Sequence, residues 1–182
     1  MMESTKKMLY QFQEGDATMR DLLGGKGAGL SEMSRLGLHV PPGFIITTEA
    51  CLSYFKSDGQ WPAGLWEQIP AYIKQLEKAM SREFGSAYSP LLVSVRSGAK
   101  ISMPGMMDTI LNLGINDDIV VGLGRLMGDL RPALDAYRRF IQKYAEVVMG
   151  MEAQEFENII ENHKKKQGVD LDHKLSVERL RK

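Results

Sequence analysis

The stretch Leu91–Leu113 constrains the fold of this chain more than any other. It begins with LLVSV, an apolar and partly β-branched run that is typical of a buried strand. Arg96 follows at once, so the strand would deliver a guanidinium group to its end. The next residues are too rich in glycine, serine and proline for a helix or a strand, and the apolar pattern resumes at Ile110. A loop rich in backbone N–H groups beside a fixed cation is suited to binding an anion.

A glycine-rich segment nearer the N-terminus, LLGGKGAGL, offers a second anion site. Apolar residues at helical spacing follow it, namely Leu30, Met33 and Leu36, and Gly37 stands where a left-handed cap would end the helix. A helix that opens on glycines presents N–H groups and the positive end of its dipole, and Lys26 adds a full charge. The segment is not a Walker A loop, because Arg20 replaces the first glycine and Gly27 replaces the Ser or Thr after the lysine. A tight turn with a solvated lysine is the alternative.

Strands and helices alternate in the first half of the chain. Two short strands are predicted, over residues 8–12 and 44–47. Thr48 is expected to cap a short helix over residues 48–55, and a long amphipathic helix follows, with Pro70 near its first turn and Gly85 at its end. The apolar stripe of the long helix is Ile69, Tyr72, Ile73, Leu76, Met80 and Phe84. This order predicts an α/β (α+β) lobe in which the long helix packs on a sheet.

The second half has a helical pattern and shows no strand. Three helices are predicted, over residues 119–127, 132–149 and 153–166, and Asn116 is a good N-cap for the first. We therefore predict two domains: an α/β first lobe over residues 1–113 and a helical subdomain over residues 114–182.

Basic residues on two of these helices have competing interpretations. Arg138, Arg139 and Lys143 could face a ligand, but a solvated helix face is favoured. The run Lys164–Lys166 suits a helix C-terminus, where cations interact with the helix dipole, better than it suits a nucleic-acid patch.

Composition and charge narrow the function classes. The 182 residues carry 23 basic and 23 acidic side chains, so no general field attracts nucleic acid or a membrane surface. No window approaches the roughly 18 apolar residues of a membrane span. Cys51, the single cysteine, excludes an internal disulfide and is interpreted as a small buried hydrophobe rather than a reactive thiol. We expect a cytoplasmic protein with no nucleic-acid or membrane partner.

The C-terminus points to a longer polypeptide. Ser176 is typical of an N-cap, yet fewer than two helical turns remain before Lys182, and a helix that short is marginal. We expect the chain to be a piece of a longer protein; a frayed tail is the alternative.

Four segments carry a family resemblance. They are GGKGAGLSEM at residues 24–33, PPGFIITTEAC at 41–51, LLVSVRSGAKISMPGMMDTILNLGIND at 91–117 and AYRRFIQKYAEVVM at 136–149. Together they resemble the N-terminal nucleotide-binding region of the pyruvate, phosphate dikinase family, and the third segment is the most specific. A looser pattern is similar to the wider family of phosphoenolpyruvate-utilising dikinases, which includes phosphoenolpyruvate synthase.

The resemblance implies an ATP site of the ATP-grasp type, a cleft between two lobes of which residues 1–113 would form the first. Lys26 and Arg96 match the family's phosphate-binding lysine and arginine, and as catalytic residues they would neutralise charge on the transferred phosphoryl group. Thr109 matches a threonine near the nucleotide, and Asp108 is expected to fix the loop before it rather than to bind magnesium. The residues of that loop, implied to bind the nucleotide, are Ser102, Met103, Pro104, Gly105, Met106 and Met107. Its three methionines could instead fill gaps in an apolar wall.

The resemblance also implies cofactors and partners beyond this chain. The family uses ATP and Mg²⁺, and its magnesium ligands lie on the opposing lobe, so no metal ligand is assigned here. Its phosphocarrier histidine follows a Thr-Ser pair in a later domain, and none of the three histidines of this chain has that context. The implied partners are the remaining domains of a parent polypeptide, namely the opposing ATP lobe, the phosphohistidine domain and the pyruvate domain, and the parent is expected to be a homo-oligomer.

The implied reaction of the parent converts ATP, phosphate and pyruvate into AMP, pyrophosphate and phosphoenolpyruvate through a phosphohistidine. The isolated chain is expected to bind nucleotide weakly and not to turn over. One alternative is a dikinase similar to phosphoenolpyruvate synthase, which uses water in place of phosphate. The other is a non-catalytic interaction module, in which the glycine turns are structural and the helical half docks a partner.

Overall fold

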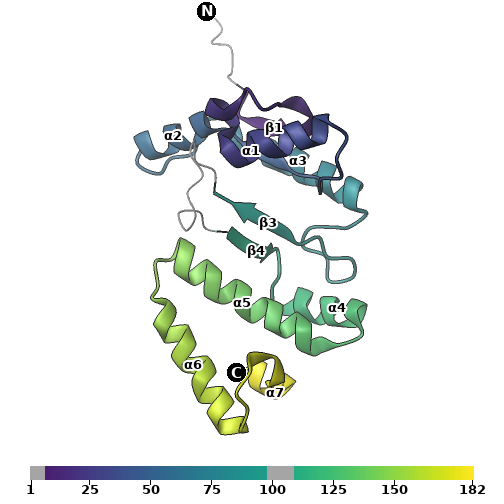
Figure 1. The fold of residues 1–182 in the computed structure, drawn as a ribbon, viewed down its shortest axis with the longest axis vertical. Coiled ribbons are helices and arrows are strands. Elements are labelled where there is room, and N and C mark those ends of the chain that lie inside the picture. The colour runs from purple at the N-terminus through teal and green to yellow at the C-terminus, as the bar shows by residue number, and fades with distance from the viewer. Residues whose placement is uncertain (1–6, 98–108) are drawn as a thin grey trace, which may run out of the picture. The chain divides into compact units, whose positions relative to one another are not determined.

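The computed structural model describes residues 7–97 and 109–182 and divides them into two compact units (Figure 1). The first unit contains residues 7–81 and Ser97, and the second contains residues 82–96 and 109–182. Each unit combines helices with a two-stranded antiparallel sheet, so the predicted α+β class is confirmed. Within the described ranges, no helix is both long enough and apolar enough to cross a membrane.

The first unit is built around one of these sheets. Its elements are β1 (Leu9–Gln11), the 3-10 turn η1 (Phe12–Glu14), α1 (Arg20–Arg35), β2 (Phe44–Ile46), α2 (Thr48–Lys56) and α3 (Leu65–Met80). β1 and β2 pair antiparallel, with Tyr10 opposite Ile45. The Tyr72 hydroxyl of α3 donates to the Leu9 carbonyl oxygen at 3.0 Å, and the Tyr72 ring centroid lies 5.3 Å from that of Phe44. The predicted packing of the long helix on a sheet is therefore confirmed.

Two helix ends in this unit differ from their predictions. α2 is capped by Thr47 and not by Thr48, because the Thr47 Oγ1 accepts a hydrogen bond from the Ala50 N–H at 3.2 Å. α3 ends at Met80 because Ser81 takes left-handed backbone angles, with φ 51°, so the helix does not reach Gly85.

Apart from Leu23, the buried residues of α1 are small: Gly24, Gly27, Ala28 and Ser31. Gly27 and Ser31 are buried, whereas Met33 and Leu36 of the expected apolar face are exposed. A Cβ atom on Gly27 would stand only 3.1 Å from the Cδ1 atom of Ile45. The helix therefore approaches β2 closely because it carries no bulky side chain there.

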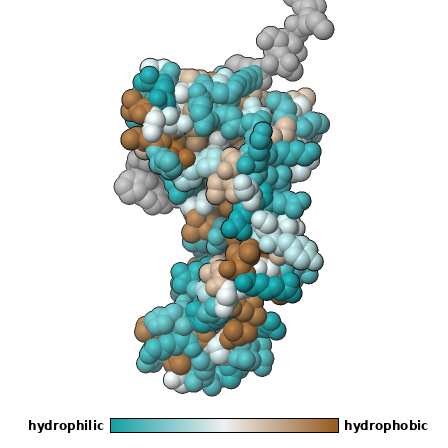
Figure 2. All heavy atoms as spheres, turned by 90° about the vertical axis from the view of Figure 1, so that its right-hand side faces the viewer, coloured by the Kyte–Doolittle hydropathy of each residue, from teal (hydrophilic) through white to brown (hydrophobic). Residues whose placement is uncertain are grey.

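Apolar side chains also reach the surface, as brown areas among polar ones show in Figure 2. In the first unit, the ring of Trp61 contacts those of Tyr54 and Trp66 at centroid distances of 5.1 and 5.4 Å, and both tryptophans are exposed. Cys51, on α2, is exposed as well. Its interpretation as a buried hydrophobe was wrong, because the buried residue of that helix is Ala50.

The second unit joins a β-hairpin to helices. Its elements are β3 (Val93–Arg96), β4 (Thr109–Leu113), α4 (Asp117–Met127), α5 (Leu130–Val148), α6 (Ala153–Gln167), the 3-10 turn η2 (Asp172–Lys174) and α7 (Val177–Leu180). The three long helices agree with their predictions to within two residues at each end. The Asn116 Oδ1 caps α4 as predicted, because it accepts from the N–H groups of Asp118 and Ile119 at 3.1 and 2.9 Å. The core is Ile115, Ile119, Val120, Ala133 and Leu134.

β3 is not the buried strand that its sequence predicts. Ser94, Val95 and Arg96 are exposed, and the buried residue of this stretch is Leu91, which precedes the strand. A β-branched run fits a pleated, half-buried surface, which a hairpin provides without burial on both faces. The hairpin groups with the helices that follow it, so among the described residues the second unit begins at Arg82 and only Ser97 returns to the first unit. A functional division at residue 113 stays a prediction.

Gly122 permits a close contact inside the second unit. The loop before β3 is closed by the Leu91 N–H, which donates to the Glu83 carbonyl oxygen at 2.8 Å. The Ala87 backbone of this loop lies directly against α4, where a methyl group on Gly122 would overlap the Ala87 carbonyl oxygen. Backbone atoms cannot rotate away as a side chain can, so this position requires glycine.

Substitution Gly122→Ala should lower the free energy of unfolding by about 1–3 kcal/mol, because the added methyl group overpacks the contact. Urea unfolding followed by circular dichroism measures the change. The matched control is Gly29→Ala, at a helical glycine with no atom within 4 Å of the added Cβ. It should be neutral or stabilising by up to about 1 kcal/mol. Equal effects of the two variants would contradict the close contact.

Candidate functional site

A backbone break at Gly24 divides α1 into two helical pieces. Gly24 has φ 71° and ψ 166°, outside the helical region, and it is buried. This conformation is essentially restricted to glycine. The second piece therefore has its own N-terminus, whose first-turn N–H groups lack intrahelical acceptors and stand at the positive end of the helix dipole. The sequence prediction that a glycine-rich turn opens a helix agrees with this arrangement.

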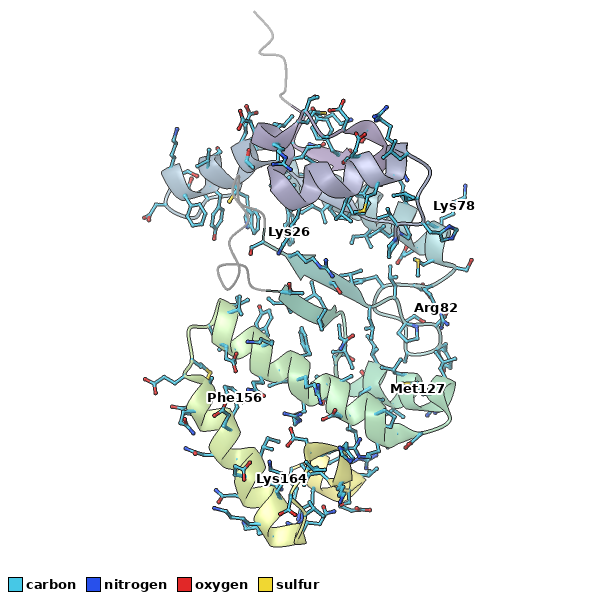
Figure 3. All side chains as sticks on the ribbon, in the orientation of Figure 1. Lys26, Lys78, Arg82, Met127, Phe156 and Lys164 are labelled. Carbon is cyan, nitrogen blue, oxygen red and sulfur yellow. The ribbon has the colours of Figure 1, made fainter. Side chains whose placement is uncertain are left out.

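Lys26 lies in the first turn after the break, on α1 as labelled in Figure 3. Its residue is half-buried, and no hydrogen bond or ion pair joins its ammonium group to another described residue. The neighbouring Gly27 is buried against β2, so the backbone that carries Lys26 is anchored. A fixed backbone, a glycine break and a lysine that has no partner among the described residues together suit a phosphate group.

The residues before the break are bound to the second piece of α1 and to α2. The Ala17 N–H donates to Glu32 Oε2 at 3.2 Å, and Glu32 forms an ion pair with Arg35 at 2.6 Å. From α2, the Thr48 hydroxyl donates to the Asp21 carbonyl oxygen at 2.5 Å. The Arg35 guanidinium, together with the Ala17 N–H, holds the pKa of Glu32 below its usual range. The sequence predicted Thr48 as a helix cap and did not predict its bond to Asp21. The two residues are 27 positions apart, so no local pattern indicates that bond.

Arg96 and Thr109 are brought together by the hairpin of the second unit. They stand opposite each other as the last residue of β3 and the first residue of β4. Arg96 is exposed and Thr109 is half-buried. The ladder is irregular between Val93 and Val95, and Asn112 has φ 60°, a left-handed conformation that asparagine tolerates.

The other predicted binding residues belong to one stretch of the sequence. Ser102, Met103, Pro104, Gly105, Met106 and Met107, with Asp108, lie outside the described residues. Lys26 belongs to the first unit and Arg96 to the second. Across residues 7–97 and 109–182, no group of three or more His, Cys, Asp or Glu side chains could hold a metal ion.

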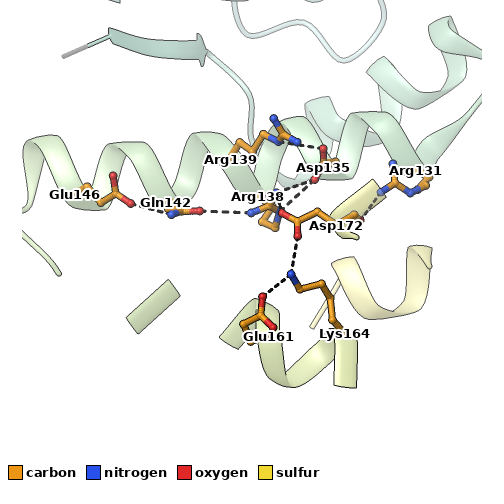
Figure 4. A network of polar contacts seen from close by, with 9 residues as sticks. All are labelled: Arg131, Asp135, Arg138, Arg139, Gln142, Glu146, Glu161, Lys164 and Asp172. Atoms are coloured by element: carbon orange, nitrogen blue, oxygen red, sulfur yellow. Dashed lines mark hydrogen bonds and ion pairs between the residues drawn. The ribbon is translucent and has the colours of Figure 1, made fainter. Parts of the chain in front are cut away.

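A network of charges connects α5, α6 and the segment before α7 (Figure 4). Arg138 pairs with Asp135 at 2.9 Å and with Asp172 at 3.3 Å, and Lys164 pairs with Asp172 at 3.2 Å and with Glu161. The side chains of Arg138 and Lys164 are only 16% and 12% exposed. Glu161 and Asp172 raise the pKa of Lys164. The interpretation of Arg138 as part of a solvated face was wrong, because its ion pairs leave the side chain only slightly exposed. Its partner Asp172 lies 34 residues away, so the local pattern did not indicate the pair.

Comparison with known proteins shows which family model the first unit resembles in sequence. Residues 20–78 match the family model described as the AMP/ATP-binding domain of pyruvate phosphate dikinase. This segment contains the Gly24 break, Lys26 and Thr48, and it ends before Arg96.

Whole-chain comparison extends the similarity to both units. The chain is 50% identical over 175 residues to pyruvate, phosphate dikinase of Clostridium symbiosum, and the alignment covers 96% of this chain and 20% of that relative. It is 52% identical over 175 residues to pyruvate, phosphate dikinase of Rhizobium meliloti, and the alignment covers 94% of this chain and 20% of that relative. It is 45% identical over 183 residues to the chloroplastic pyruvate, phosphate dikinase 1 of Zea mays, and the alignment covers 98% of this chain and 19% of that relative. This chain is homologous to a segment of pyruvate, phosphate dikinase. It spans about a fifth of the length of these relatives.

Substitution Gly24→Ala should destabilise the first unit by about 1–3 kcal/mol, because alanine at this φ and ψ is strained. Thermal unfolding measured by circular dichroism tests this, with Gly29→Ala in the same helix as the control. A wild-type melting temperature for Gly24→Ala would mean that the break is not required.

The Glu32 tether should be sensitive to acid. Its pKa is lower in the folded chain than in the unfolded one, so its contribution to stability is present above about pH 4.3 and is lost as the pH falls through the lowered folded value. Substitution Glu32→Gln should therefore lower the melting temperature at pH 6, and the difference from wild type should shrink toward pH 3. A difference that is the same at both pH values would contradict the role of the carboxylate.

Proposed function

We propose that this chain provides part of the ATP site of a dikinase that converts ATP, phosphate and pyruvate into AMP, pyrophosphate and phosphoenolpyruvate through a phosphohistidine. The observation that carries the proposal is the position of Lys26, in the first turn after the Gly24 break and within the segment that matches an AMP/ATP-binding domain. Identity of about one half to pyruvate, phosphate dikinases along almost the whole chain supports it.

Within this proposal, Lys26 and Arg96 bind the phosphates of ATP. Both carry full positive charge, and Lys26 adds to the field of a helix N-terminus. Their charges neutralise the negative charge that spreads over the oxygen atoms of the transferred phosphoryl group, which lowers the barrier to transfer. Thr109 contacts the same ligand as Arg96 in this proposal, and its position opposite Arg96 in the hairpin supports this.

The remaining parts of the site come from outside the described residues. We infer that loop residues 102–107 cover the phosphates and that the site is of the ATP-grasp type, closed by a second lobe. Mg²⁺ shields the phosphate charges when it is bound, through ligands on that lobe. The phosphohistidine and pyruvate domains, the homo-oligomeric state and the cytoplasmic location belong to the same proposal for the parent protein.

The isolated chain should bind MgATP weakly and should not turn over. A hydrogen bond to a charged group contributes about 1.5–3 kcal/mol, so the loss of several contacts from an absent lobe lowers affinity by many powers of ten. Amide NMR titration with millimolar MgATP measures the residual binding. Phosphorylation of a histidine by the isolated chain would contradict the proposed inactivity.

Substitutions Lys26→Ala and Arg96→Ala should each weaken MgATP binding roughly ten- to hundredfold, because each removes a charge-assisted contact. The matched controls are Lys78→Ala and Arg125→Ala, which remove exposed cations of the first and second units and should have no effect. The same titration, repeated in a longer dikinase polypeptide, measures the change where binding is tighter. Micromolar binding that survives both site substitutions would contradict the proposed site.

A further inference from the structure

The Asp21 carbonyl group has an unusual hydrogen-bond donor. In an unbroken helix, this carbonyl would accept from the N–H of Gly25, four residues later. The angles at Gly24 turn the chain out of the helical path between these two residues. The Thr48 hydroxyl, from another helix, donates to the Asp21 carbonyl oxygen at 2.5 Å.

The position of Thr48 is determined by the sheet. The N–H of the preceding residue, Thr47, donates to the Met8 carbonyl oxygen at 2.9 Å, beside the β1–β2 pairing. The Thr47 side chain is fully buried and caps α2 through the Ala50 N–H. Thr48 is the first residue of that helix, so the sheet and the cap hold its hydroxyl in place.

These contacts form a continuous path from the sheet to the cation. Met8, just before β1, binds the Thr47 N–H. Thr48 binds the Asp21 carbonyl group, and the short helical piece that contains Asp21 leads through Gly24 to Lys26. Without the Thr48 hydroxyl, the Asp21 carbonyl group would gain by accepting from Gly25, which requires a continuous helix through Gly24. A continuous helix would turn Lys26 and the N–H groups of its first turn in another direction.

We propose that Thr48 is a positioning residue for Lys26: its hydroxyl keeps α1 broken at Gly24 and thereby keeps the lysine and the first-turn N–H groups directed at a phosphate group. The part of this inference that concerns a nucleotide rests on the proposed function. The part that concerns the backbone at Gly24 does not.

The test compares three variants of the full 182-residue chain by amide NMR. Thr48→Val keeps the shape of the side chain but removes the donor, and Thr48→Ser restores the donor. Ser57→Ala is the matched control, since it removes a hydroxyl that donates to the Ser53 carbonyl oxygen at 2.7 Å at the other end of α2. Signals of residues 24–27 report the backbone without ligand, and a titration with ATP reports binding.

Thr48→Val should move the signals of residues 24–27 and weaken ATP binding roughly three- to tenfold, the range expected for one lost hydrogen bond. Thr48→Ser and Ser57→Ala should stay close to wild type in both measurements. Wild-type signals and binding in Thr48→Val would overturn the proposal, and so would a Thr48→Ser variant that behaves like Thr48→Val. If wild type shows no ATP response while Thr48→Val still moves these signals, the proposed nucleotide site is refuted. Thr48 would then hold the backbone at Gly24 without positioning Lys26 for a ligand.

Discussion

The dihedral angles of Gly24 are the constraint on which the first unit's candidate site depends. They end one helical piece and begin another, so Lys26 stands at a helix N-terminus rather than in the middle of a helix. The break persists because the residues around it are held independently: Ala17 by Glu32, Asp21 by Thr48, and Gly27 by its packing on Ile45. Strain at one residue is stable only where the surrounding structure determines it in this way.

The second unit depends on α5 in a similar way. One end of this helix contributes Ala133 and Leu134 to the core, and its charged face holds the C-terminal segment. The Arg131 guanidinium donates to the carbonyl oxygens of Asp172 and Leu175 at 2.7 and 2.9 Å, and Leu175 is buried. The segment before α7 is thus bound through its backbone as well as through the Asp172 carboxylate. Short helices such as α7, marginal by themselves, gain their stability from such contacts.

Local signals predicted the elements well where a side chain acts on its own neighbours. Asn116 caps α4 as expected because the cap bonds reach only two and three residues along the chain. Such reasoning failed where a distant contact decides. Thr47 and Thr48 are adjacent and chemically identical, and the fold distinguishes them: the Thr47 N–H donates to the Met8 carbonyl oxygen, and the Thr47 hydroxyl accepts from the Ala50 N–H as the cap of α2. Similarly, Arg138 is largely shielded from solvent because Asp172 folds back onto α5 and pairs with it.

The sequence by itself determined the order of the elements, the glycine-opened helix that carries Lys26, and the resemblance that later comparison bore out. These depend on local propensity and on residue identity, both of which can be read directly. Only the tertiary structure decided that α1 enters the core with its small residues, that β3 is exposed, and that Thr48 bonds to the carbonyl group before the break. Burial and long-range hydrogen bonds depend on which segments meet, and the periodicity of a single segment does not contain that information.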